Sequence, residues 1–273
     1  MKTKSIITGA LLGALSIAGA GTITVKGSDT MVIMAQRWAE VYMADHTGVQ
    51  IQVTGGGSGT GISALINGTT DICNSSRPIK SSERESLKSR YSSLGVEIKS
   101  ARDGLALYVN ESNPVQELTL DQIKDIYTGK ITNWKDVGGA DAKILLYSRE
   151  NNSGTYVYFR DFVLKGKDYA ANAQNLPGTA AVVNAVSKDA NGVGYGGSAY
   201  AKGVRFIKVK KDAASLAKEP NAETVKDGSY PITRYLYMYL RSRPTGEVKA
   251  YIDWILSPEG QAVVTKVGYF PVK

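Results

Sequence analysis

Short runs rich in β-branched residues alternate with longer runs of helical periodicity over most of this chain. Thr22–Val25 predicts a strand. In Met31–Asp45 apolar residues recur at intervals of three and four, which predicts a helix with one buried face. Val49–Val53 alternates apolar and polar side chains and predicts a second strand. This alternation of strands and helices is typical of an α/β fold with largely parallel sheets.

The same pattern predicts a series of further elements along the chain. We expect strands at 71–73, 96–98, 104–110, 143–147, 193–194 and 235–240, and helices at 62–66, 81–91, 120–127, 155–164, 180–188, 247–256 and 258–266. The segment Lys208–Lys226, rich in Lys, Asp, Ala and Glu, predicts a solvent-exposed excursion.

Two runs are apolar without alternation, namely Gly104–Asn110 and Tyr235–Leu240. Such runs are typical of strands that are buried on both faces. A second set of strands and helices lies between them. The pattern therefore favours a middle segment inserted into the first domain, with the two buried strands forming the crossings.

The first twenty residues have the pattern of an export signal. Lys2 and Lys4 precede the apolar stretch Ile6–Ile17, and Ala18–Ala20 is a small-residue cleavage pattern. The apolar stretch is too short to span a bilayer. Cleavage after Ala20 removes two lysines and no acidic residue, so the formal net charge of +8 becomes +6. Because no cysteine lies near the cleavage site to carry a lipid, we expect a soluble protein of the bacterial periplasm.

Composition then excludes several kinds of site. With Cys73 and His46 as the one cysteine and the one histidine, an internal disulfide, a zinc cluster and a two-histidine mechanism are excluded. We expect no cofactor and no metal. A length of 273 residues, with 42% hydrophobic and 21% charged residues, indicates a globular protein of one or two domains. The positive charge favours nucleic acid, a membrane surface or small anions as partners.

Three loops offer the same kind of hydrogen-bond donor, namely neutral hydroxyls and backbone N–H groups. Each loop follows a predicted strand and precedes a predicted helix. They are Gly27–Thr30 (GSDT), Gly55–Gly61 (GGGSGTG) and Arg149–Thr155 (RENNSGT). Helix N-termini collect anions through unpaired N–H groups, and hydroxyls add directional donors. Arg149 would add two parallel hydrogen bonds to oxygens of a tetrahedral anion. Together the loops predict a site for a small oxyanion.

Each loop also has a purely structural interpretation. Ser28 or Asp29 is a possible N-cap, Gly55–Gly61 a flexible turn, and Arg149 a surface ion-pair partner. The glycine-rich loop is not a nucleotide-binding P-loop, because Ile62 stands where that motif needs a lysine. The occurrence of all three loops in one exported chain favours the anion site.

These motifs resemble the PstS family, the periplasmic phosphate-binding proteins that serve ABC transporters. The resemblance covers nearly the whole mature chain. It rests on Gly27–Thr30, Gly57–Gly59, Arg149-x-x-x-Ser153-Gly154-Thr155, Leu118–Trp134 (LTLDQIKDIYTGKITNW), Asn191–Tyr195, Tyr230–Arg234, Leu256–Gln261 and Gly268–Pro271. It implies an α/β, two-lobed periplasmic-binding-protein fold of type II, with two crossover strands and a ligand cleft between the lobes. The implied lobes are residues 21–106 with 236–273, and residues 107–235.

The resemblance also implies a set of phosphate-binding residues. Ser28, Asp29 and Thr30 would come from the first loop, Ser58 and Gly59 from the second, and Arg149, Ser153, Gly154 and Thr155 from the third. One position departs from the family pattern. Many members place an Asp after the third strand to accept the proton of phosphate, whereas this chain reads Ser75-Ser76-Arg77-Pro78. Ser76 and Arg77 are therefore further expected contacts.

A substitute acceptor for that proton is expected, because a carboxylate facing the ligand favours a protonated oxygen and repels a deprotonated one. Asp29 is the first choice and Glu150 the second. The alternative role for Asp29 is N-capping.

Two other function classes fit less well. A serine nucleophile needs a base, and His46 lies at a helix end away from both serine-bearing loops. The lysines and arginines are dispersed, with no nucleic-acid-reading motif. We therefore expect no enzyme and no nucleic-acid binding. The expected function is high-affinity capture of inorganic phosphate by a monomer, hinge closure, and delivery to a membrane ABC permease that is contacted transiently. The alternative is another tetrahedral oxyanion, such as sulfate, molybdate or arsenate.

Overall fold

The computed structural model describes residues 21–272, so the export signal predicted at Met1–Ala20 lies outside the described residues. The strands are β1 (Thr22–Gly27), β2 (Gln50–Gly56), β3 (Ile72–Ser75), β4 (Val96–Val109), β5 (Glu117–Thr119), β6 (Leu145–Arg149), β7 (Gln174–Leu176), β8 (Gly192–Gly197), β9 (Arg205–Lys210) and β10 (Thr233–Leu240). The α-helices are α1 (Val32–Asp45), α2 (Ser58–Asn67), α3 (Ser81–Tyr91), α4 (Leu120–Tyr127), α5 (Gly154–Tyr158), α6 (Gly178–Lys188), α7 (Ala222–Lys226), α8 (Gly246–Ile255) and α9 (Pro258–Val267). Short 3₁₀ turns occur at Asp29–Met31, Trp134–Val137 and Ser198–Tyr200, and Phe159–Val163 is a π-turn.

One continuous sheet runs through the molecule in the strand order β2-β1-β3-β10-β4-β8-β6-β7. β1 is parallel to β2 and β3, and β6 is parallel to β7 and β8. β10 is antiparallel to β3 and β4, and β4 is antiparallel to β8 and β9. The α/β prediction is therefore confirmed. The expectation of largely parallel strands is right at the two ends of the sheet, around β1 and around β6. It is wrong in the middle of the sheet, where the long strands β4 and β10 run in opposite directions.

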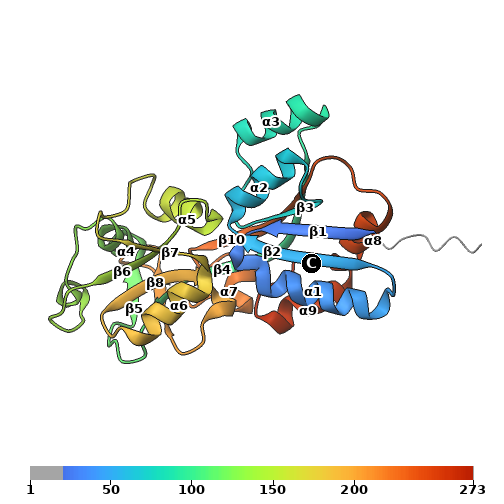
Figure 1. The fold of residues 1–273 in the computed structure, drawn as a ribbon. Coiled ribbons are helices and arrows are strands. Elements are labelled where there is room, and N and C mark those ends of the chain that lie inside the picture. The colour runs from blue at the N-terminus through green and yellow to red at the C-terminus, as the bar shows by residue number, and fades with distance from the viewer. Residues whose placement is uncertain (1–20, 273) are drawn as a thin grey trace, which may run out of the picture.

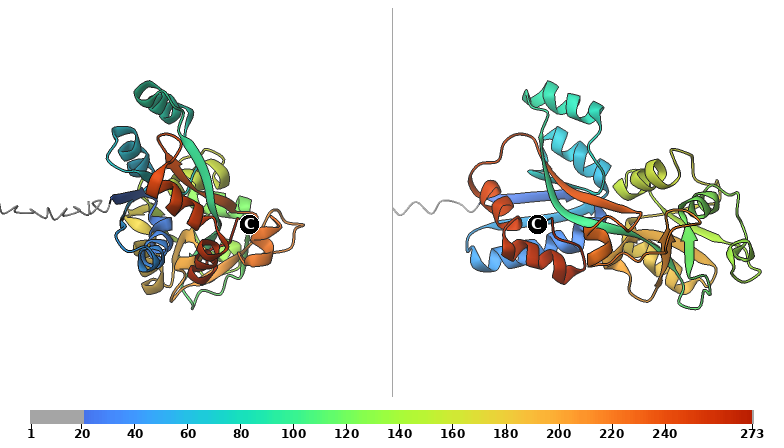
Figure 2. Two further views of the ribbon diagram at one scale, coloured as in Figure 1. Left: turned by 90° about the vertical axis from the view of Figure 1, so that its right-hand side faces the viewer. Right: turned by 180° about the vertical axis from the view of Figure 1, so that it is seen from behind.

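The two largest hydrophobic cores of the described residues share this sheet, and smaller clusters lie under α2 and α3 and under α6. The first large core packs α1, α8 and α9 against β1 and β10, and the second packs α4 and α5 with its π-turn against β4, β6 and β8. Along β4 the change from one core to the other falls between Ala101 and Leu105, and along the opposing segment it falls between Ile232, just before β10, and Leu236 within it. Figure 1 shows the blue and red elements on one side, the green and yellow elements on the other, and β4 and β10 between them. Figure 2 shows from behind that these two strands run together from one body to the other.

Local sequence accounts for the placement of α1. Met34, Ala35, Trp38, Ala39 and Tyr42 form one buried stripe at helical spacing. The Trp38 indole N–H donates to the carbonyl of Gly260 at 2.7 Å, so the polar end of this buried ring is satisfied. This contact joins the first helix of the described chain to its last.

Two local predictions need correction. β4 is one strand of 14 residues, whereas the sequence pattern predicted separate strands at 96–98 and 104–110. The segment Lys208–Lys226 is not a solvent-exposed excursion at its ends, since β9 buries Val209 and α7 buries Val225. The gap between the two predicted strands is closed because the polar residues of β4 pair with β10, and Val209 and Val225 are buried because both belong to the second core.

The glycine-rich loop is shorter than predicted, because α2 already begins at Ser58. Gly61 faces β1 so closely that a Cβ there would lie 2.6 Å from Gly27 Cα and 2.6 Å from the Lys26 carbonyl oxygen. This glycine lets α2 sit directly against the strand. Cys73 is fully buried beside it, in the core position expected for a free cysteine. Within residues 21–272, no helix combines the length and apolar character needed to cross a bilayer.

We predict that Leu107→Ala destabilises the protein by about 2–5 kcal/mol, because it opens a cavity at a fully buried position of β4. Urea unfolding followed by circular dichroism measures this change. Leu216→Ala is the matched control, since Leu216 is 79% exposed and its truncation should leave the unfolding midpoint in place. Equal midpoints for the two variants would contradict the assignment of Leu107 to the core.

Candidate functional site

The ends of β1, β3 and β6 converge at one place between the two cores. The first loop follows β1, Ser76 follows β3, and Arg149 ends β6. α2 begins beside them at Ser58, and α5 begins at Gly154. The carboxyl ends of strands in open α/β sheets are the usual place for ligands. Polar side chains gather here in an otherwise apolar interior.

A cluster of four buried hydroxyls forms the centre of the site. Thr155 Oγ1 lies 2.8 Å from Thr30 Oγ1 and 3.3 Å from Ser76 Oγ. Ser58 Oγ lies 3.3 Å from Ser76 Oγ and accepts a hydrogen bond from the Ser76 backbone N–H at 3.0 Å. Thr155 lies on the side of the site that is formed by the second core, and Thr30, Ser58 and Ser76 lie on the side formed by the first core. Each hydroxyl can donate or accept, so the cluster can offer several donors to one bound anion.

Gly154 brings the two sides into contact. A Cβ at this position would lie 2.2 Å from Ser58 Oγ and 2.8 Å from Ser76 Oγ, so a side chain does not fit there. The Gly59 N–H donates to the Asn152 carbonyl at 2.9 Å, and the Asn152 amide donates to the Gly56 carbonyl at 3.0 Å. The two sides of the site are therefore in direct contact, and the site is closed. Asn152 was not predicted as a site residue.

Ser153 is the N-cap of α5. Its hydroxyl accepts hydrogen bonds from the N–H groups of Thr155 at 3.2 Å and Tyr156 at 3.3 Å. The cap holds the turn that presents Gly154 and Thr155 to the hydroxyl cluster.

Arg149 is 1% exposed, so it is not the surface ion-pair residue of the structural interpretation. Its guanidinium donates to Thr179 Oγ1 at 2.8 Å and to Asp29 Oδ2 at 2.7 Å, while Nε is buried without a partner among the described residues. Burial lowers the pKa of Arg149, and the Asp29 charge opposes that shift. Asp29 and Arg149 lie on opposite sides of the site, so their ion pair also joins the two sides.

Asp29 has a different role from the predicted N-cap. Ser28 is the N-cap of the 3₁₀ turn, and no side chain caps it. Asp29 Oδ1 accepts a hydrogen bond from the Gly56 N–H at 2.7 Å, and Oδ2 is the partner of Arg149. The capping prediction is wrong because the carboxylate reaches across to these two groups instead. Its role as acceptor of the phosphate proton stays a prediction. In that role a phosphate O–H group would compete with the Gly56 N–H and with Arg149 for the two oxygens of Asp29.

The remaining predicted residues divide into those near the cluster and those away from it. Ser28 is buried, and its hydroxyl has no partner among the described residues. Arg77 is buried but its guanidinium donates to Glu83 at 2.7 and 2.9 Å and to the Pro78 carbonyl at 2.9 Å. The structure therefore does not bring Arg77 to the hydroxyls, because Glu83 at the start of α3 holds it. Glu150 is exposed.

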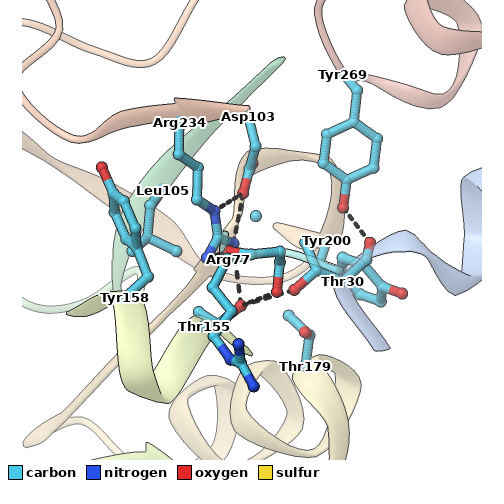
Figure 3. A network of polar contacts seen from close by, with 12 residues as sticks. Thr30, Arg77, Asp103, Leu105, Thr155, Tyr158, Thr179, Tyr200, Arg234 and Tyr269 are labelled. Carbon is cyan, nitrogen blue, oxygen red and sulfur yellow. Dashed lines mark hydrogen bonds and ion pairs between the residues drawn. The ribbon is translucent and has the colours of Figure 1, made fainter. Parts of the chain in front are cut away.

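Asp103 and Arg234 are the main residues that sequence reasoning missed. They lie directly opposite each other on β4 and β10. Arg234 Nε and Nη2 donate to Asp103 Oδ2 at 2.9 and 2.7 Å, Nη2 also donates to Thr155 Oγ1 at 3.0 Å, and Nη1 donates to the Ser76 carbonyl at 3.0 Å. Figure 3 shows this ion pair beside Thr155. The sequence contained two features that could have indicated these residues. Arg234 belongs to the motif Tyr230–Arg234, and Asp103 is a charged residue at the start of an apolar strand.

The arrangement can bind a small oxyanion through neutral hydrogen-bond donors, in a site whose own charges nearly cancel. Two buried guanidinium groups each face a carboxylate, so the charges of the site largely cancel. Hydroxyls and backbone N–H groups supply the direct donors.

Comparisons with known proteins agree with this picture. The family model described as PBP superfamily domain matches residues 14–259. The chain is 32% identical to the phosphate-binding protein PstS of Pseudomonas aeruginosa, over 92% of this chain and 83% of that protein. It is 32% identical to the phosphate-binding protein PstS of Bacillus subtilis, over 92% of this chain and 81% of that protein.

Solved structures give the same result. A putative phosphate ABC transporter substrate-binding protein with bound phosphate, from Clostridium perfringens, matches with a TM-score of 0.84 and 34% identity, over 93% of this chain and 100% of that chain. An ABC-type phosphate transport receptor from Vibrio cholerae matches with a TM-score of 0.73 and 30% identity, over 91% of this chain and 99% of that chain.

We predict that Gly154→Ala keeps the two sides apart, because its methyl group would overlap the Ser58 and Ser76 hydroxyls. Small-angle X-ray scattering should show a larger radius of gyration than for the unsubstituted protein under the same ligand conditions. Tyr156→Phe, in the same helix, is the control and should leave the radius of gyration unchanged. An unchanged radius for Gly154→Ala would show that the contact yields locally without separating the two sides.

Proposed function

This chain belongs to the PBP superfamily and, within it, to the phosphate-binding PstS proteins, and on that premise we propose that it captures inorganic phosphate outside the cytoplasm and delivers it to an ABC importer. The observation that carries the proposal is the buried hydroxyl cluster around Thr155, which receives groups from both sides of the site and includes Thr30, the chain neighbour of the Arg149 partner Asp29.

The proposed phosphate contacts follow from that geometry. Thr30, Ser58, Ser76 and Thr155 donate through their hydroxyls, and Arg149 supplies charge from one side. Ser28, Gly59, Ser153 and Gly154 complete the proposed contact set. Asp29 acts on phosphate through Arg149, which it holds in place. Arg77 stabilises the turn before α3 through Glu83 and is left out of the contact set.

Binding requires that the closed site opens. We propose that residues 21–106 with 236–273 form one lobe and residues 107–235 the other, and that the hinge lies where β4 and β10 pass between the two cores. Opening would separate Thr30 from Thr155, Gly59 from Asn152 and Asp29 from Arg149. Phosphate bound among the hydroxyls would draw the lobes together again, and closure would re-form the ion pair between Asp29 and Arg149. High affinity is expected because the bound anion is then removed from solvent.

The proposed location is the periplasm, reached through a cleavable signal peptide at Met1–Ala20. The protein would act as a monomer that contacts its membrane permease transiently. This proposal is supported by the similarity to the phosphate-binding PstS proteins and to a putative phosphate ABC transporter substrate-binding protein.

We predict no hydrolysis of a chromogenic phosphate ester. Within the part of the chain that the structure describes, the hydrogen-bond partners of the Ser58 and Ser153 hydroxyls are another hydroxyl and backbone N–H groups, and neither serine has a base beside it. Release of the chromophore above the rate in buffer, by protein purified free of phosphatases, would contradict this prediction.

Isothermal titration of the purified mature chain with phosphate, sulfate and molybdate tests the proposed function. Tight binding of phosphate alone is the expected result. Tight binding of sulfate or molybdate instead would favour the alternative oxyanion, and absence of phosphate binding would refute the proposal.

We predict that Arg149→Ala weakens phosphate binding by about 100-fold or more. The substitution removes a buried charge partner and leaves Asp29 unpaired beside an anion, and such losses are typically ~2–5 kcal/mol. Arg243→Ala is the control, because it removes the same charge from an exposed position. Equal affinities for the two variants would place the anion away from Arg149.

A further inference from the structure

One oxygen of Asp103 has no hydrogen-bond partner within residues 21–272. Asp103 is 0% exposed, and its Oδ2 accepts both hydrogen bonds from Arg234. Oδ1 is buried and has no partner among the described residues. An ionised carboxylate can only accept hydrogen bonds, and a buried acceptor without a donor is unfavourable. This oxygen therefore needs a donor that the described part of the chain does not supply.

The unpartnered oxygen lies at the hydroxyl cluster. Arg234 Nη2 contacts Asp103 and Thr155 Oγ1 at the same time. A Cβ built on Gly197 would lie 3.1 Å from Asp103 Oδ1 and 3.2 Å from Thr30 Cγ2, so this oxygen and Thr30 border the same small space. Figure 3 shows Asp103 and Thr30 within one network of polar contacts around Thr155.

The neighbouring phenols cannot act as the missing donor. The hydroxyl of Tyr269 donates to the Thr30 carbonyl at 2.5 Å, that of Tyr108 to the Gly197 carbonyl at 2.5 Å, and that of Tyr200 to the Asp29 carbonyl at 2.6 Å. A phenol has one proton to donate, and in each case that proton is already used. Burial, followed by the charge of Asp103, raises the pKa of Tyr108 and Tyr269, which keeps both phenols in this neutral donating form.

We propose that Asp103 accepts a hydrogen bond from a protonated oxygen of the bound anion and so selects oxyanions that carry a proton. The proposal rests on the proposed function, because it assigns a specificity-determining residue to that site. Phosphate and arsenate keep at least one proton at neutral pH, whereas sulfate and selenate keep none. A deprotonated oxygen against Oδ1 would place two acceptors together without a proton between them, in a buried site.

Asp103 fits this role better than the carboxylates expected from the sequence. Each oxygen of Asp29 already has a donor of its own, and Glu150 is exposed. Ser76, which stands where many relatives have an Asp, is a neutral hydroxyl already in contact with Ser58 and Thr155.

The test is Asp103→Asn, titrated with phosphate, arsenate, sulfate and selenate. Arg234 donates twice to Oδ2, so it should hold the amide oxygen of Asn in that place and turn the NH₂ group toward the anion. The site would then offer a donor where it offered an acceptor. We expect the phosphate-to-sulfate and arsenate-to-selenate affinity ratios to fall together, by about 10- to 100-fold, the equivalent of one buried unpaired group. We compare these affinity ratios and not the single affinities, because removing the negative charge of Asp103 raises the affinity for every anion.

Two further variants separate Asp103 from the other carboxylates. Asp29→Asn should weaken all four anions alike through Arg149 and leave both ratios unchanged. Asp253→Asn, at an exposed position of α8, should change neither affinities nor ratios. Unchanged ratios in Asp103→Asn, or a fall of the ratios in Asp29→Asn instead, would overturn the assignment while phosphate binding by the unsubstituted protein still stands.

The unsubstituted protein provides a second measurement if Asp103→Asn fails to fold. Monofluorophosphate has the shape of phosphate but no O–H group at neutral pH, so it should bind at least about tenfold more weakly than phosphate. Equal affinity would overturn the role of Asp103. Failure of the unsubstituted protein to bind phosphate at all would refute the proposed function, and this inference with it.

Discussion

The antiparallel pairing of β4 with β10 is the interaction on which the rest of this molecule depends. β4 contributes to both of these hydrophobic cores, and so does the segment Tyr230–Leu240 that contains β10, so the register of the two strands fixes how the two halves of the protein face each other. The same register sets Asp103 opposite Arg234, and Arg234 in turn contacts Ser76 and Thr155 from opposite sides of the site. The strands that connect the two cores thus also contribute a residue to the hydroxyl cluster.

Electrostatic balance is the second principle of the site. Arg149 and Arg234 are both buried, and in the closed form each is neutralised by a carboxylate. A buried guanidinium without a carboxylate partner would be strongly unfavourable. In the proposed binding mode, hydroxyls and backbone amides recognise the anion by the direction of their hydrogen bonds, and Asp103 recognises its proton. The net charge of the whole chain acts at longer range, by drawing anions toward the surface.

Much of the fold follows from local pattern. Most helices lie within a few residues of their predicted bounds, because periodicity and turn residues are properties of short segments. The three loops were recognisable because glycine, hydroxyl residues and Arg149 occur together between a strand and a helix. The contacts of Arg77 and Asp29 could not be predicted, because no local pattern identifies their partners, namely Glu83 at the start of α3 and Arg149 across the site. Asp103 and Arg234 needed the strand register, which no local pattern contains.

The positions of β1 and α9 have a consequence for how the protein can be handled. The first strand and the last helix of the described chain pack into the same core, while the whole middle segment leaves and returns through β4 and β10. A tether or fusion attached at either end would therefore hold one half and leave the other half free to swing. A pair of fluorophores, one on each half, would convert that swing into an optical signal without touching the chain termini.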